Sequence, residues 1–394
     1  MQANGTRLQH IFSYGFRPLF LLAGLHALIS IPLWTLYWSG HLGIELQRAG
    51  PYFHGHEMIS GFVAAAMAGF LLTAVANWTQ RPPVAGWPLA LLCGLWLAGR
   101  LAFNHPWAAA AADLAFWSLL TLLVARELIQ AGNRRNYKLL LVLALFLLSD
   151  AFYHIAELGG NPAQLQPVVW FQLLLTIILI NLIGGRIIPA FTGNWLRNRA
   201  LQQQNTTPTL PPAFNRLDLC ATFALLAFIV ILLTPDAPER LQAGLAAVAC
   251  LLQFLRLSRW KALHTRAEPL IWMMHLAYLW IPLGLGLWAL ALIGLIPVSA
   301  ALHALAGGTV AGMIMAVSSR ATLGHSGQEL HSSPLLTTAV LLLSLATIFR
   351  VVGSISGDMI WLQLSALSWT VAFSAWLWCF VPILLGRADA AGER

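Results

Sequence analysis

Two histidines and a glutamate stand together at the start of a long apolar run. They are His54, His56 and Glu57, and the run from Met58 to Val75 contains no charged residue. Titratable residues are costly at or inside a bilayer and usually have a function there. Neutral imidazoles and carboxylates are also ligands for transition metals and haem iron. The motif therefore predicts a metal site, with Glu57 as a proton relay.

His54 and His56 are two residues apart, and such residues do not face each other on a regular helix. Both can bind one metal only if the segment is extended or lies at a frayed helix start. Otherwise one binds a metal and the other has a different partner. Hydrogen bonds to loop carbonyls at the membrane interface are the alternative for both.

A second set of polar residues is Asp150, His154 and Glu157, at positions i, i+4 and i+7. This spacing places them along one face of a helix. A carboxylate one turn from a histidine fixes its tautomer and raises its basicity as a ligand. We therefore expect His154 to bind metal, with Asp150 and Glu157 supporting it or relaying protons. A buried salt bridge from Asp150 to an arginine is the alternative.

Small residues follow two of these histidines at helical spacing. His303 precedes Gly308 and Gly312, and the run after His56 contains Gly61 and Gly69. Small-residue stripes let a neighbouring helix or a flat cofactor approach closely. Helix packing alone explains most such stripes. A histidine before each one favours a haem between them.

Two histidines lie deeper in apolar runs. His275 follows Met273 and Met274 and is a candidate axial ligand, with a hydrogen-bonded core histidine as the alternative. His26 is isolated in the first apolar run, and we expect it to be a packing residue.

Three arginines, Arg17, Arg186 and Arg320, each stand at a predicted helix end. Guanidinium groups bind carboxylates, including haem propionates, in a forked geometry. Extension of these side chains to lipid headgroups is the alternative.

The composition is that of a polytopic membrane protein. The 394 residues are 59% hydrophobic and only 9% charged, against about 25% charged residues in soluble domains. We expect one transmembrane domain over residues 1–394. The four cysteines form no close pairs, so no disulfide framework or zinc site is expected. The net charge of +8 fits basic loops at a bilayer surface better than a nucleic-acid partner.

A span needs about 20 apolar residues. The sequence predicts about twelve transmembrane helices, at 16–38, 53–78, 84–103, 107–130, 137–158, 166–189, 216–234, 238–258, 268–293, 298–320, 334–354 and 358–386. The first is expected to be retained rather than cleaved as a signal peptide. Residues 190–215 are predicted to form a polar cytoplasmic linker between spans 6 and 7.

With these spans, 18 of the 22 Lys and Arg residues fall on the side of the N-terminus. The other side holds only Arg48, Arg100, Arg240 and Arg350. The positive-inside rule makes the richer side cytoplasmic, with both termini inside.

The assembled motifs resemble the NnrS family of bacterial membrane proteins that contain haem and copper. The resemblance spans the chain, and the matching stretches are Gly15-Phe16-Arg17-Pro18, His54-Gly55-His56-Glu57-Met58, Arg186-Ile187-Ile188-Pro189 and His303 to Gly327. It implies bound haem, expected to be b-type, and copper, in a multi-pass protein of the bacterial inner membrane that acts in the nitric oxide response. The family motifs carry over onto Arg17, His54, His56, Glu57, Arg186, His303, Arg320 and His325, and with less surrounding motif onto His154 and His275.

The resemblance favours a haem–copper protein that binds nitric oxide and reduces or oxidises it. Glu57, Asp150 or Glu157 would relay protons. Turnover would require an electron donor, which the sequence does not identify. One alternative is a protein that sequesters or senses nitric oxide or metal without turnover. Another is an ion-coupled transporter that uses its intramembrane charges as an ion path.

Overall fold

Helices coincide with all twelve predicted spans. A computed structural model describes residues 7–43, 45–46, 48, 50–203 and 208–386, and these ranges contain no strand. Ten helical runs in them are long and apolar enough to cross a membrane. The two shorter ones, α5 and α9, have 15 and 17 residues. The prediction of an all-α polytopic membrane protein is therefore confirmed, while the exact number of spans and the side of the termini stay predictions.

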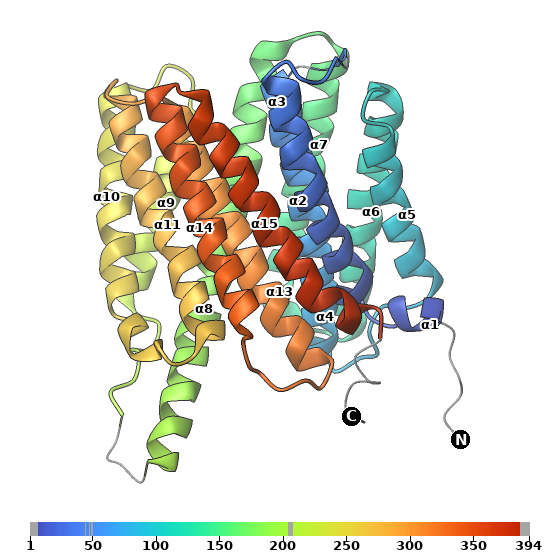
Figure 1. The fold of residues 1–394 in the computed structure, drawn as a ribbon, viewed down its shortest axis with the longest axis vertical. Helices are drawn as coiled ribbons and strands as arrows, with labels where there is room; N and C mark the ends of the chain where they lie inside the picture. Colours follow the sequence, from blue (N-terminus) through green and yellow to red (C-terminus); the bar gives the residue numbers. More distant parts are fainter. Residues whose placement is uncertain (1–6, 44, 47, 49, 204–207, 387–394) are drawn as a thin grey trace. The chain divides into compact units, whose positions relative to one another are not determined.

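The described residues divide into two compact units. Unit 1 consists of Met1–Leu173, Ser318–Glu329 and Phe373–Arg394, and unit 2 of Leu174–Val317 and Leu330–Ala372. The helices wholly within unit 1 are α1 (Arg7–Ile11), α2 (Phe16–Trp38), α3 (Gly50–His56), the π-helix η1 (Glu57–Val63), α4 (Ala64–Thr79), α5 (Trp87–Leu101), α6 (Pro106–Gln130) and α7 (Lys138–Leu158) (Figure 1). The single domain over residues 1–394 stays a prediction.

Successive long helices of unit 1 run antiparallel, so alternate helix ends lie at one end of the unit (Figure 1). The end where α3 and α6 begin also holds the ends of α5 and α7, and it is the end predicted to face outward. Proline marks two of the helix starts, at Pro88 and Pro106, where a missing backbone N–H costs nothing. This arrangement brings the polar positions of several helices to one depth.

Unit 2 holds most of the remaining helices. They are α8 (Leu165–Gln202), α9 (Arg216–Leu232), α10 (Glu239–Ser258), α11 (Pro269–Leu292), α12 (Val298–His303), the π-helix η5 (Ala304–Ala311), α13 (Gly312–His325), α14 (Pro334–Ser356) and α15 (Met359–Leu384). The division into units falls within α8, α13 and α15.

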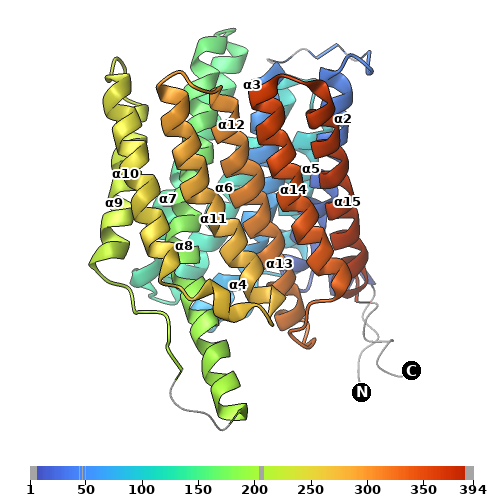
Figure 2. The ribbon, with the colours of Figure 1, turned by 60° about the vertical axis from the view of Figure 1, so that its left-hand side comes forward.

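The helix α8 continues well past the predicted end of its span. It runs to Gln202, and its last turns project beyond the ends of α9, α10 and α11 (Figure 2). Pro189 lies inside the helix and does not end it. Arg199 packs over the Trp195 ring one turn away, at 5.1 Å. The first half of the predicted linker is therefore helical, and residues 204–207 lie outside the described residues.

A buried polar network ties four helices of unit 2 together. The Arg256 guanidinium donates to Asp218 Oδ1 at 2.8 Å, to Asn181 Oδ1 at 2.7 Å and to the Tyr278 hydroxyl at 2.8 Å. Arg256 is 1% exposed, so its charge depends on these partners. Asp218 also accepts from the backbone N–H of Asn215 and so caps the start of α9.

Replacement of Arg256 with methionine is expected to lower the free energy of unfolding by about 3–5 kcal/mol, because it leaves the Asp218 carboxylate buried without its cation. Thermal unfolding in detergent, followed by circular dichroism, measures the effect. Arg259→Met is the matched control, since Arg259 is partly exposed and bonds Asn215, the residue before α9, rather than a buried carboxylate. Equal losses in the two variants would contradict the role given to the network.

Candidate functional site

Four buried side chains of unit 1 gather as a metal-binding set would. His56 ends α3, Asp113 lies on α6, and Asp150 and His154 lie on α7. One ligand atom from each lies within 4.8 Å of those from the other three. None of the four residues is more than 2% exposed. They lie about 6–12 Å along their helices from one end of the unit.

Three of these side chains present atoms that have no hydrogen-bond partner among the described residues. They are His154 Nε2, Asp113 Oδ2 and Asp150 Oδ2. The imidazole nitrogen lies 3.5 Å from each carboxylate oxygen, which is too long for a hydrogen bond. A buried polar group without a partner is costly, so three that face one another favour an ion or a proton between them.

The opposite atoms of the two carboxylates are fixed by neighbours. Asp150 Oδ1 accepts from Ser60 Oγ at 2.6 Å and lies 2.9 Å from His56 Nε2. Asp113 Oδ1 accepts from the guanidinium of Arg100. Each carboxylate therefore has one anchored oxygen and one oxygen directed at His154.

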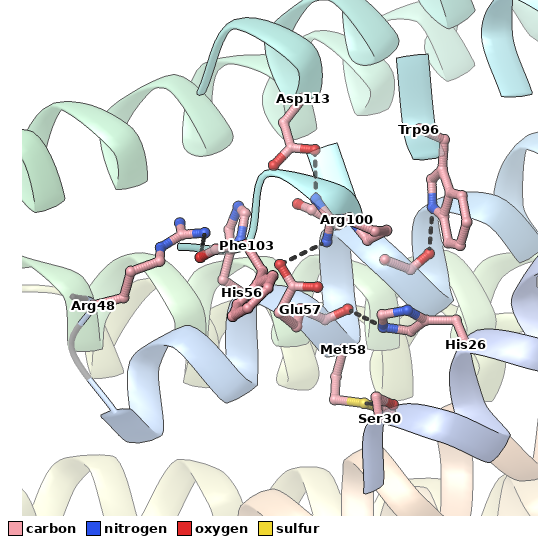
Figure 3. A network of polar contacts seen from close by, with 12 residues as sticks. His26, Ser30, Arg48, His56, Glu57, Met58, Trp96, Arg100, Phe103 and Asp113 are labelled. Carbon is pink, nitrogen blue, oxygen red and sulfur yellow. Dashed lines mark hydrogen bonds and ion pairs between the residues drawn. The ribbon is translucent and has the colours of Figure 1, made fainter. Parts of the chain in front are cut away.

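Arg100 bridges two carboxylates of the site. Its guanidinium contacts Asp113 on one side and Glu57 Oε1 on the other, at 2.9 Å in the second case (Figure 3). Arg100 and Glu57 are both largely buried, with side chains 7% and 11% exposed. Glu57 is thus held beside the cluster by an ion pair.

A second arginine, Arg48 in the loop before α3, forms an ion pair with Glu157 at the edge of the network. Arg48 donates to both oxygens of Glu157, at 2.8 and 2.6 Å. Burial disfavours the charged guanidinium, but the hydrogen bond and charge of Glu157 outweigh it, so the pKa of Arg48 is raised. Glu157 Oε2 in turn lies 3.8 Å from His154 Nδ1. The Tyr153 ring stacks on His56 at 4.0 Å and covers the cluster from one side.

The predicted stripe of Asp150, His154 and Glu157 lies on one face of α7 and lines this network. His54 and His56, both predicted to bind metal, have different partners, which is the second of the two arrangements that their spacing left open. His56 enters the cluster, whereas the His54 ring stacks on Trp34 at 4.7 Å. The assignment of metal to any of them stays a prediction.

The predicted residues near the start of α2 lie far from the cluster. Arg17 contacts His10 and donates to the Ile383 carbonyl at 3.0 Å, and the His325 ring stacks on Tyr14 at 5.8 Å. Arg17 is separated by the length of α2, about 30 Å, from the loop that carries Arg48. Arg320 lies on α13, one turn before His325.

Three further predicted site residues lie in unit 2. They are His275, His303 and Arg186, and their contacts within that unit are as follows. His275 Nε2 lies 3.0 Å from the Thr192 hydroxyl. His303 Nδ1 donates to the Ser299 carbonyl at 2.7 Å. Arg186 is exposed on α8.

The small-residue stripes are covered by protein side chains. The Trp280 ring packs directly on Gly308, and the Ala277 methyl lies against Gly312. In unit 1 the His26 ring packs on Gly61 and the Phe20 ring on Gly69. Rings do lie on three of these glycines, but they are side chains of neighbouring helices.

Sequence reasoning missed Asp113, Arg100 and Arg48. Asp113 interrupts the alanine run that opens α6, and an acid within an apolar span was the signal that could have found it. Arg48 and Arg100 are two of only four Lys or Arg residues on the predicted outer side. Their scarcity on that side was the signal that each pairs with a buried acid.

A search of curated proteins found no match. A sequence model of the NnrS protein family matches residues 10–387. This match takes in both units and every residue of the buried cluster. The chain therefore belongs to the NnrS family.

Proposed function

We propose that the chain acts in the nitric oxide response as a membrane metalloprotein, with a metal centre at His56, Asp113, Asp150 and His154. Family membership supports a role in this response. The observation that carries the metal centre is the convergence of His154 Nε2, Asp113 Oδ2 and Asp150 Oδ2, all buried and without a hydrogen-bond partner among the described residues.

The donor set suits copper, the metal that the family resemblance implies. Imidazole nitrogen and carboxylate oxygen together bind Cu(II), Fe(II) or Zn(II), whereas Cu(I) prefers sulfur ligands. His154 Nε2 lies 3.5 Å from each of the two carboxylate oxygens, so the three atoms are close enough to share one ion.

The charge of the network favours a divalent ion. The network contains the guanidinium groups of Arg48 and Arg100 and four carboxylates. The carboxylates are those of Glu57, Asp113, Asp150 and Glu157. With both imidazoles neutral, as metal ligands must be, the network carries a charge of −2. Such a charge is costly in an apolar span, and one divalent cation neutralises it. The competing state has two protonated imidazoles and no metal.

A bound copper or iron ion would supply nitric oxide binding and electron transfer. The chain holds the ligands in place through Ser60 and Arg100 and excludes water by burial. Complete burial favours a ligand as small as nitric oxide. Burial also favours a second candidate function, in which the protein binds one equivalent of nitric oxide and does not reduce or oxidise it.

Haem remains part of this proposal. His275 and His303 both stay candidate haem ligands. His275 Nδ1 is buried without a hydrogen-bond partner among the described residues, while its Nε2 contacts the Thr192 hydroxyl. His303 bonds the Ser299 carbonyl through Nδ1. Arg17, Arg186 and Arg320 stay candidates for the propionates, and the electron donor and the bacterial inner membrane stay expectations.

Metal analysis of protein purified in mild detergent tests the centre. Wild-type protein is expected to hold about one copper per cluster after incubation with Cu(II) and removal of excess. His154→Ala and Asp113→Asn should lose it, while His264→Ala, in an exposed turn of unit 2, should retain it. Full copper in both cluster variants, or none in the wild type, would exclude a metal at this site.

Addition of nitric oxide then separates the two candidate functions. Repeated consumption in the presence of reductant indicates an enzyme. A single equivalent bound, with a shifted spectrum and no further loss, indicates sequestration.

A further inference from the structure

The backbone changes its hydrogen-bond pattern immediately after the proposed ligand His56. The π-helix η1 spans Glu57–Val63 and contains Glu57 and Ser60, which contact Arg100 and Asp150. π-helical turns are rare and occur often at functional sites. The direction in which these side chains point depends on what supports η1.

Two ring N–H groups from other helices bond carbonyls of this segment. His26, on α2, lies with Nε2 3.0 Å from the Glu57 carbonyl oxygen. Trp96, on α5, donates Nε1 to the Gly61 carbonyl oxygen at 2.9 Å. Because a carbonyl only accepts, His26 carries its proton on Nε2. Figure 3 shows both rings with their N–H groups directed at backbone oxygens of the segment.

The contact between His26 and η1 requires a glycine in η1, at Gly61. A Cβ atom at Gly61 would lie 2.5 Å from His26 Nε2, so only glycine admits the ring. The rings of His26 and Trp96 also meet edge to face, with centroids 5.7 Å apart. The two rings and the glycine thus form one support.

We propose that His26 and Trp96 are positioning residues for the metal centre. By bonding the Glu57 and Gly61 carbonyls they hold η1 in its π-helical form, so that His56 and Ser60 reach the same oxygen of Asp150. Neither ring touches the four ligands through any contact described above. The role rests on the proposed metal centre and gives function to a histidine expected only to pack.

The electron paramagnetic resonance spectrum and affinity of bound Cu(II) test this role. Trp96→Phe and His26→Phe keep a ring but remove the N–H, and each is expected to weaken Cu(II) binding about 10–100-fold and alter the spectrum. His26→Gln, whose amide can donate to the same carbonyl, should recover most of the affinity. Trp288→Phe, a buried tryptophan of unit 2, is the control and should leave the spectrum unchanged.

Hydrogen–deuterium exchange over residues 56–66 gives a second measurement that needs no metal. Loss of either N–H should speed exchange there, and Trp288→Phe should not. Wild-type spectra, affinity and exchange in both Trp96→Phe and His26→Phe would overturn the inference. If the wild type binds no copper, the proposed function fails, and exchange alone decides whether the two rings support η1.

Discussion

Asp150→Asn is expected to abolish tight metal binding while the protein stays folded. Asp150 contacts both imidazoles of the cluster, with Oδ1 2.9 Å from His56 Nε2 and Oδ2 3.5 Å from His154 Nε2. Asparagine keeps the shape and can still accept from Ser60, but it lacks the negative charge that a divalent ion requires. We expect the affinity for Cu(II) to fall by at least about 100-fold. This loss is larger than the typical loss of about 10–100-fold on mutation of a residue that only supports a ligand.

Competition with a chelator of known affinity measures this loss, and circular dichroism reports the fold. Asp236→Asn is a matched control, because Asp236 is exposed in a turn with φ of +58° that asparagine also tolerates. Its affinity for Cu(II) should equal that of the wild type. If Asp150→Asn binds copper as tightly as this control, Asp150 is a structural ion-pair partner and the ion lies elsewhere.

Features that depend on one helix could be predicted from the sequence. The spacing of Asp150, His154 and Glu157 placed them on one face of α7, and the network confirms that they line it together. The spacing of His54 and His56 left two arrangements open, one shared metal or different partners, and their rings contact Trp34 and Tyr153 respectively. Both inferences need only the geometry of a single helix.

Features that depend on contacts between helices could not be predicted in the same way. Asp113 and Arg100 come from neighbouring spans, and their pairing follows from the register of α5 against α6. The helix periodicity of the run after His56 gave no sign of η1, because the π-helix depends on donors supplied by α2 and α5. The glycine stripe in that run was correctly seen as an approach surface, but its occupant at Gly61 is His26.

The continuation of α8 past Pro189 could not be predicted either. Proline predicts a helix end because it lacks an N–H and crowds the carbonyl four residues earlier. The helix nevertheless runs to Gln202.

Replacement of Arg100 with leucine is expected to cause the largest loss of stability in unit 1. The guanidinium pairs with Glu57 and Asp113, so its removal leaves two buried carboxylates without their cation. Breaking a buried pair in this way typically costs about 3–5 kcal/mol. Thermal unfolding of metal-free protein in detergent should show a correspondingly lower midpoint. Arg240→Leu, at an exposed arginine predicted to lie on the same side of the membrane, should change it little.

The double variant Arg100→Leu/Glu57→Gln separates charge from packing. If the loss arises from an excess of negative charge, removal of the Glu57 charge should restore part of the stability, although a second ion-pair partner has been deleted. If the leucine instead destabilises the protein by packing poorly, the losses of stability caused by Arg100→Leu and by Glu57→Gln should add. Recovery of stability in the double variant would mean that Arg100 balances the negative charge of Glu57 and Asp113 in this network.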